Sequence, residues 1–352
     1  MHSAFFLGAN SRDGFVSLYD DLIDLKSARA VYILKGGPGS GKSSFMKKIA
    51  NIAVERGLDT ERIFCSSDPD SLDGLILPEL GIALVDGTSP HVVEPKYPLA
   101  VEEYVNLGAF ADAFEIRLHK DEIIRTKDRY STYFKRVYRL TSAAAATQSE
   151  LLDLALGGIA PERIAKKAVG IISRELHGTG SGGVRKSRFL SAISPDGYVS
   201  LFKTVDEYEN VFMIEDNFGL AMFMLQPILD AARDRNYDAV ACYSPLTPER
   251  LEHVFIPELS LAFITSKKKA EYTGAYKRRI RIDAMIDPNV IRAHKRRISL
   301  ARNLSDAMIH EACGILREAK GIHDELELIY NPYIDFEGLY ALASKLSRDI
   351  LG

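Results

Sequence analysis

The chain has 352 residues, 46% of them hydrophobic and 26% charged, and a formal net charge of −3. This composition is typical of a globular protein rather than a disordered one, and the length favours two domains or one domain with a large insertion. No apolar run reaches the roughly 18 residues of a membrane span, and no basic segment precedes the short apolar stretch at the start. The three cysteines are widely separated, which indicates buried thiols rather than disulfides or a metal site. We therefore expect a cytoplasmic protein with no membrane partner.

The segment 31–44, VYILKGGPGSGKSS, predicts a strand, a glycine-rich loop and the start of a helix. Within it, GGPGSGKS fits G-x-x-x-x-G-K-[ST] at every fixed position. Glycines let successive N–H groups point into one concavity, and the helix N-terminus adds partial positive charge there. Lys42 should reach the β- and γ-phosphates of a nucleotide, and the Ser43 hydroxyl should ligate Mg²⁺. The predicted cofactor-binding residues are Gly36, Gly37, Pro38, Gly39, Ser40, Gly41, Lys42, Ser43 and Ser44.

A second magnesium ligand is expected at the end of the apolar strand GIALVD (81–86), where Asp86 is followed by Gly87. Many ATP-hydrolysing motors place a Glu at the position of Gly87, and the chain has no guanine-recognition motif. Phosphoryl transfer or slow ATP-gated switching is therefore favoured over fast hydrolysis or guanine specificity. Of the polar residues after the strands, we assign Asp68 to catalysis together with Lys42 and Asp86. Further candidates, for each of which turn formation is the alternative, are Asp70, Asp73, His91 and Glu94.

A repeat covers about 80 residues in each half of the chain, with a separation of 177 to 183 residues. Its matched pairs are LGANSRDGFVSLYD (7–20) with LSAISPDGYVSLFK (190–203), VYIL (31–34) with VFMI (211–214), RIFCSS (62–67) with AVACYS (239–244), and LPELGIALVDG (77–87) with IPELSLAFITS (256–266). This alignment sets Cys65 opposite Cys242. Each copy alternates strand and helix patterns, so we predict parallel sheets with helices on both faces.

The stretch VFMIEDNFGLAMFM (211–224) takes the place of the phosphate loop in the second copy. By the alignment, the first-copy residues and their replacements are Gly36 and Asp216, Lys42 and Met222, Ser43 and Phe223, Asp68 and Pro245, Asp86 and Thr265, and His91 and Ala270. The lysine, the magnesium hydroxyl and the carboxylate are lost together, as expected if they form one site. Glu215 and Asp216 also put negative charge where phosphates would lie. We therefore expect one ATP per chain and a second copy that serves as a folded scaffold.

Residues 100–176 are helical by their periodicity, and the glycine-rich segment HGTGSGGVRKSR that follows is expected to be a linker rather than a second phosphate loop, because no apolar strand precedes it. Two C-terminal helices are expected at 299–330 and 335–350, separated by Asn331-Pro332. The predicted divisions are a competent copy at 1–99, a helical insertion at 100–176, a linker at 177–188, a degenerate copy at 189–270, and a basic segment with C-terminal helices at 271–352.

Positive charge concentrates between residues 267 and 302, where twelve Lys or Arg accompany three acids. Such a cluster can contact nucleic acid, but no nucleic-acid-binding motif accompanies it, so a solvated helix face is the favoured interpretation. An arginine from outside the loop often stabilises the charge of phosphoryl transfer. The candidates, among which the sequence does not choose, are Arg125, Arg129, Arg136, Arg139, Arg233 and Arg250.

Four stretches carry a resemblance to a known family: GANSRDGFVSLYD, ILKGGPGSGKSSFMKKI, CSSDPDSLDGLILPELGIALVDGTSPHVVEPKYP and AKGIHDELELIYNPYIDF. With them the chain resembles, over nearly its whole length, bacterial tandem P-loop proteins known as ATPases or nucleotide-kinase-like proteins of unassigned role. The resemblance implies a duplicated P-loop NTPase-type α/β fold, ATP binding at Gly36–Ser43 and a cytoplasmic location. The second half of such proteins can also carry a phosphate loop, and this chain departs from that.

Two functions are consistent with these features. The first is a phosphotransferase or slow ATPase that uses ATP and Mg²⁺ and an acceptor that the sequence does not identify. The alternative is an ATP-gated binding protein, in which nucleotide orders the helical segments or the basic 267–302 region for a protein or nucleic-acid partner.

Overall fold

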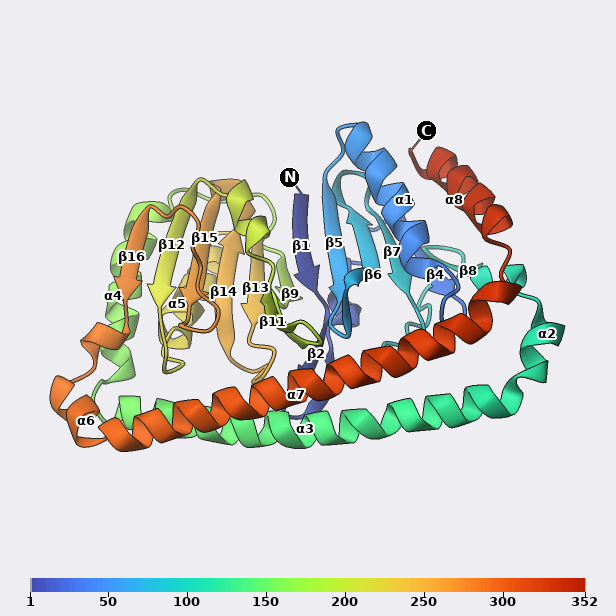
Figure 1. The fold of residues 1–352 in the computed structure, drawn as a ribbon. Helices are drawn as coiled ribbons and strands as arrows, with labels where there is room; N and C mark the ends of the chain where they lie inside the picture. The colour runs from blue at the N-terminus through green and yellow to red at the C-terminus, as the bar shows by residue number, and fades with distance from the viewer. Residues whose placement is uncertain (1, 352) are drawn as a thin grey trace.

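The computed structural model describes residues 2–351, which form two six-stranded sheets (Figure 1). The first sheet has the strand order β1 (His2–Phe6), β5 (Thr60–Cys65), β6 (Asp68–Leu77), β7 (Ile82–Asp86), β4 (Ala30–Lys35) and β8 (Glu102–Asn106). The second has the order β9 (Arg185–Arg188), β13 (Ala239–Tyr243), β14 (Leu251–Ile256), β15 (Leu261–Ser266), β12 (Asn210–Glu215) and β16 (Arg278–Arg281). Counted from β1 and from β9, the two sheets follow the same connectivity.

The α/β class is confirmed, but both sheets are mixed, and the prediction of parallel sheets was wrong. In the first sheet β6 is antiparallel to β5 and β7, while the other pairs are parallel. The second sheet repeats this with β14 between β13 and β15. The physical reason is the connection length. Only Ser66 and Ser67 separate β5 from β6, and so short a link joins antiparallel strands, because a parallel crossover needs a dozen or more residues.

Each half also carries a small hairpin, β2 (Gly8–Ser11) with β3 (Gly14–Ser17) and β10 (Ser191–Ser194) with β11 (Gly197–Ser200). Phe6 and Phe189, which precede these hairpins, are joined by a pair of backbone hydrogen bonds of 2.8 and 2.9 Å. These two residues correspond in the repeat, so the two halves contact each other through equivalent residues.

The α-helices also repeat in order. They are α1 (Lys42–Glu55), α2 (Ala113–Leu118), α3 (Lys120–Leu156) and α4 (Pro161–Glu175), then α5 (Met222–Asp234), α6 (Pro288–Ala293), α7 (Lys295–Tyr330) and α8 (Phe336–Leu351). The short 3-10 helices are η1 (Tyr19–Asp21), η2 (Pro78–Leu80), η3 (Leu107–Phe110), η4 (Phe202–Glu207), η5 (Pro257–Leu259), η6 (Asp283–Met285) and η7 (Asn331–Tyr333). Figure 1 shows α3 and α7 running antiparallel, side by side, along both sheets.

The two halves exchange their last helices. Helix α3 leads away from the first sheet, and α4 packs against α5 of the second half; α7 returns, and α8 packs against α1 (Figure 1). The segment 100–176 therefore has a counterpart at 271–352 and is not an insertion unique to the first copy. The predicted ends of the two copies, 99 and 270, also fall short, because β8 and β16 complete the sheets beyond them.

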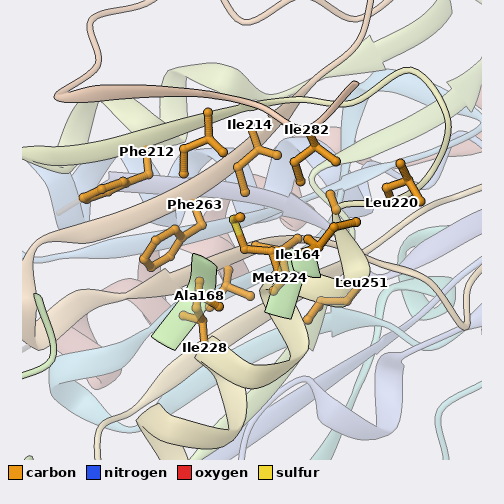
Figure 2. Close-up of a cluster of buried hydrophobic side chains, with 14 of the residues drawn as sticks. Ile164, Ala168, Phe212, Ile214, Leu220, Met224, Ile228, Leu251, Phe263 and Ile282 are labelled. Atoms are coloured by element: carbon orange, nitrogen blue, oxygen red, sulfur yellow. The ribbon is translucent and has the colours of Figure 1, made fainter. Parts of the chain in front are cut away.

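Helices cover one face of each sheet rather than both, which corrects the second part of the fold prediction. Helices α4 and α5 bury Ile164, Met224 and Ile228 against the second sheet (Figure 2), and α1 and α8 cover the first sheet in the same way. The opposite faces of both sheets share one core, in which the Phe5 and Phe255 rings meet edge to face at 5.8 Å. Each sheet therefore buries this face in the shared core, without a second layer of helices.

One ion pair between the halves is fully buried. The Arg188 Nε donates to Glu61 Oε1 at 2.6 Å, and the other guanidinium nitrogens donate to the carbonyl oxygens of Asp21 and Leu22. Arg188 belongs to β9, so the predicted linker 177–188 ends in a strand of the second sheet. Within residues 2–351, no helix is both long and apolar enough to cross a membrane.

Strand register also corrects the alignment of the cysteines. Ile63 pairs with Gly74 in the first sheet, and Cys242 pairs with His253 at the equivalent place in the second. Cys65 therefore lies two residues beyond the counterpart of Cys242. The same register sets Glu252 at the position of Asp73, so an acid occurs there in both halves.

Candidate functional site

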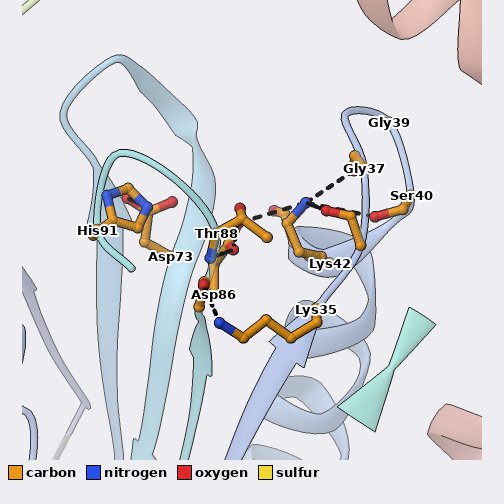
Figure 3. Close-up of polar contacts among 12 residues, drawn as sticks. Lys35, Gly37, Gly39, Ser40, Lys42, Asp73, Asp86, Thr88 and His91 are labelled. Atoms are coloured by element: carbon orange, nitrogen blue, oxygen red, sulfur yellow. Dashed lines mark hydrogen bonds and ion pairs between the residues drawn. The ribbon is translucent and has the colours of Figure 1, made fainter. Parts of the chain in front are cut away.

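The glycine-rich loop joins β4 to α1, whose first residue is Lys42 (Figure 3). Gly39 and Gly41 have φ angles of +66° and +74°, a left-handed conformation that is strained for residues with a side chain. Because the first N–H groups of a helix have no intrahelical acceptor, those at the start of α1 are available to an anion held by the loop. The local geometry is thus that of an anion cradle at a helix N-terminus.

Lys42 and Asp86 are brought together at the mouth of this loop. The Lys42 Nζ donates to the carbonyl oxygens of Gly36 and Gly37 at 3.1 and 3.0 Å and lies 3.7 Å from Asp86 Oδ2 (Figure 3). The contact follows from sheet register, because β4 and β7 are parallel neighbours and Leu34 pairs with Asp86. Both side chains are only 12% exposed.

The two predicted magnesium ligands offer oxygen atoms of the kind that Mg²⁺ prefers. The Ser43 Oγ accepts a hydrogen bond from the backbone N–H of Leu72 at 2.9 Å. The Asp86 Oδ1 accepts two, from the backbone N–H and the hydroxyl of Thr88, at 2.8 and 2.6 Å. These bonds hold the carboxylate in place and leave Oδ2 facing Lys42. The donor types, a hydroxyl and an oriented carboxylate, are therefore those of a magnesium site.

Asp73 and His91 lie beside Asp86, and each of the three places one potential ligand atom within 4.8 Å of the others. His91 Nε2 is 3.5 Å from Asp73 Oδ2, the Tyr19 hydroxyl donates to the same oxygen at 3.0 Å, and Tyr19 stacks on the His91 ring at 4.7 Å. Burial raises the pKa of Asp73, nearby His91 opposes that shift, and the charge of Asp86 adds to it. The buried His91 Nδ1 has no hydrogen-bond partner within residues 2–351.

The structure separates the acids that the sequence offered as a group. Asp68 lies at the start of β6, 38% exposed, with its carboxylate 3.8 Å from the Lys320 Nζ, and it is not part of the Asp73–Asp86 cluster. Glu94 pairs with Lys35 at 2.9 Å. Asp73 is therefore the better placed acid, which the sequence prediction did not single out.

The end of α7 lies over the glycine-rich loop, which sequence reasoning did not foresee. The Gly39 N–H donates to Glu327 Oε1 at 3.2 Å. With its side-chain amide turned so that both contacts form, the Asn331 nitrogen donates to the carbonyl oxygens of Gly39 and Glu327 at 3.2 and 3.3 Å. A methyl group placed on Gly37 would be 3.1 Å from the Tyr330 ring. A carboxylate from a helix 288 residues away in sequence thus occupies one of the loop's N–H donors.

Gly87 has a steric reason for lacking a side chain. A Cβ atom there would be 2.4 Å from Ile33 Cγ2, so the carboxylate that many motors place at this position has no room.

Of the arginines proposed to assist catalysis, Arg129 pairs with Glu325, Arg233 with Asp234, and Arg250 donates to Ser149. Across residues 2–351, none of the six candidates forms a hydrogen bond or ion pair with the phosphate loop or Asp86.

In the second half, Asp216 fills the degenerate loop with its own carboxylate. Oδ1 accepts the backbone N–H groups of Phe218 and Gly219 at 3.0 and 2.9 Å, and Oδ2 accepts that of Ala221 at 2.7 Å. Glu215, the other acid of this loop, pairs with Arg279 instead. The donors that a phosphate would need are therefore already satisfied.

The basic segment 267–302 is partly neutralised by acids from other elements. Its ion pairs are Lys267 with Glu252, Lys269 with Asp306, Lys277 with Glu175, Arg279 with Glu215, and Arg297 with Glu150. Comparisons with protein-family models, curated proteins and solved structures found no match to this chain.

Proposed function

We propose that the first half binds ATP·Mg²⁺ at Gly36–Ser44 and transfers the γ-phosphoryl group to an acceptor or slowly to water. One observation carries the proposal: the Lys42 ammonium lies at a glycine loop and helix N-terminus, 3.7 Å from a strand-end carboxylate. Backbone N–H groups, lysine and Mg²⁺ together neutralise the phosphate charge that develops during transfer. We further propose that the protein acts in the cytoplasm.

Each residue of the site has a role in this proposal. Lys42 would leave the carbonyl oxygens of Gly36 and Gly37 and contact the β- and γ-phosphates. Ser43 and Asp86 would hold the magnesium ion, which supplies positive charge to the phosphate oxygens. Thr88 keeps the Asp86 carboxylate oriented through its two hydrogen bonds.

Asp73 and His91 are the groups best placed to accept a proton from an attacking hydroxyl or water. Asp73 is buried, its raised pKa makes it a stronger base than an ordinary carboxylate, and His91 Nε2 is 3.5 Å away. The absence of a carboxylate at Gly87 supports transfer to a bound acceptor over fast hydrolysis. The surface-facing Asp68 would then serve the acceptor side of the site rather than the proton transfer.

The decisive test is Lys42→Ala, with calorimetric titration of ATP·Mg²⁺ as the measurement. We expect this variant to lose both ATP binding and turnover. Lys47→Ala, on the exposed side of the same helix, is the matched control and should retain both. Unchanged ATP binding in Lys42→Ala would rule out this site. Incubation with γ-labelled ATP·Mg²⁺ and a panel of metabolites would then show whether the phosphate goes to water, to a small molecule or nowhere.

A second candidate, an ATP-gated binding protein, is favoured by the contact between Glu327 and Gly39. Nucleotide entering the loop must displace this carboxylate, and α7 runs from there to the second half. This function predicts turnover near background and ATP-dependent hydrogen-exchange protection in α7 or in 267–302. Salt-sensitive nucleic-acid binding that is lost on neutralising Arg278, Arg279, Arg296 and Arg297 would identify the partner as nucleic acid; its absence would remove that version.

A further inference from the structure

A cavity of about 870 Å³ lies in the second half, at the place that corresponds to the phosphate-binding edge of the first. Its walls are the degenerate loop, the loops that follow β13 and β15, the tip of the β10–β11 hairpin, and the facing sides of α3 and α7. Pockets that bind small molecules typically measure about 300–1,000 Å³. The half that lost its phosphate loop has therefore kept a space of ligand size.

The lining of this cavity is positively charged. Seven Lys or Arg side chains contribute to it against four Asp or Glu. The cations come from separate elements: Arg250 follows β13, Lys267 follows β15, and Arg302 lies on α7. Cations that three separate elements contribute to one cavity are suited to an anionic ligand, whereas a row along one helix would be an ordinary solvated face.

Most of the acids in the lining are already engaged. Asp216 accepts three backbone N–H groups, Glu252 pairs with Lys267, and Asp306 lies 3.8 Å from the Lys269 Nζ. Arg250 has only a neutral partner, donating to the Ser149 hydroxyl at 3.1 Å, and the Arg302 guanidinium lies 4.6 Å from the centre of the Phe218 ring. Neither arginine is paired with a carboxylate within residues 2–351, so both retain positive charge for a ligand.

Burial makes the charge of Arg250 costly, because no carboxylate pairs with it within residues 2–351, whereas Lys267 is already paired with Glu252. Burial lowers the pKa of Lys267 to about 8 and also lowers the pKa of Arg250. The buried hydroxyl-bearing residues Ser244 and Thr247 lie beside these cations and are the kind of donors that accompany phosphate recognition. A bound anion would offset the charge of Arg250.

We propose that the second half binds a small organic phosphate in this cavity, without magnesium and without a phosphate loop. Guanidinium groups match the geometry of phosphate oxygens, so Arg250 and Arg302 would hold the phosphate, with Lys267 as a third cation. Thr265 stands where the first half has the magnesium-binding Asp86, and the degenerate loop is closed by Asp216, so neither device of the first site is present. This site is independent of the proposed ATP site.

The test is calorimetric titration of the Lys42→Ala variant with pyrophosphate in the presence of EDTA. The substitution removes the lysine of the proposed first-half site, and EDTA removes the magnesium ion. We expect one binding event per chain, about tenfold weaker in Arg302→Gln, since a charged hydrogen-bond partner is lost. Arg296→Gln, an exposed arginine on the same helix but outside the cavity lining, is the matched control and should change the affinity less than twofold. Arg250→Gln removes a cation that a different element contributes, and it should also weaken pyrophosphate binding.

Folding of each variant is checked by circular dichroism, and the partly exposed Arg302 keeps the test valid if Arg250→Gln does not fold. Absence of pyrophosphate binding to folded Lys42→Ala would overturn the proposal, as would equal affinity in Arg302→Gln and Arg296→Gln. Titration with malonate separates phosphate from general anion recognition, and malonate binding as tight as that of pyrophosphate would contradict the phosphate class. These outcomes do not depend on whether ATP binds the first half, so failure of the proposed function would not change them.

Discussion

If the first half binds nucleotide as proposed, the carboxylate of Glu327 should compete with it for the glycine-rich loop. Its Oε1 accepts the Gly39 N–H at 3.2 Å, and a phosphate oxygen entering the loop must replace it. A hydrogen bond to a charged group contributes about 1.5–3 kcal/mol when buried. Because the Glu327 side chain is 38% exposed and the bond is long, we take about 1 kcal/mol, which corresponds to about a fivefold change in affinity.

Glu327→Gln should therefore tighten ATP binding about fivefold by calorimetry, because the amide keeps the shape but not the charge. Burial lowers the pKa of the neighbouring His323, so at pH 7.5 its ring is neutral and the substitution leaves no unpaired cation. Glu325→Gln, which breaks an ion pair with Arg129 on the same helix, is the matched control and should leave ATP affinity unchanged. Weaker binding in Glu327→Gln would show that the carboxylate supports nucleotide rather than competing with it.

Three further predictions concern stability. Arg188→Met strands the buried Glu61 carboxylate and should lower the unfolding free energy by about 3–5 kcal/mol in urea, with partial recovery on adding Glu61→Gln; a loss below about 1 kcal/mol would contradict it. Burial lowers the pKa of His253 to about 3, so only the unfolded state takes up its proton as the pH falls below about 6.5. Stability is thus lost from pH 6.5 towards 3 by up to about 1.4 kcal/mol per pH unit, and His253→Gln should flatten that profile. Gly87→Ala should destabilise by about 1–3 kcal/mol in thermal unfolding because its Cβ would meet Ile33; an unchanged transition would refute the steric argument.

The local part of the site was predictable because its chemistry is contiguous in sequence. Eight adjacent residues specify the glycine loop and the helix that begins at Lys42, and the strand ending in Asp86 has a clear apolar pattern. The direction of β6 was not predicted, since apolar alternation is the same in either direction. The usable signal was the two-residue link Ser66-Ser67, which is too short for a parallel crossover.

Contacts between distant segments were beyond the sequence patterns. An amphipathic helix shows which face is buried but not its partner, so nothing in α4 or α8 indicates that they pack on the opposite half. Glu327 lies on a long helix among other charged residues, and only the return of α7 over the first half makes it a neighbour of Gly39. The same reasoning explains why residues 100–176 resembled an insertion.

The two halves place a carboxylate on their loop N–H groups in different ways, and the difference supports the proposal that only the first loop admits a nucleotide. In the second half the carboxylate belongs to the loop, accepts three N–H groups and is 1% exposed, so no ligand can displace it without remodelling the fold. In the first half it comes from Glu327 on another helix, accepts one N–H group and is partly exposed. Displacing it requires only a local movement at the end of α7. The Asp216 loop is thus closed by its own side chain, whereas the Gly39 loop is closed by a single contact from α7, which a phosphate would displace in the proposed function.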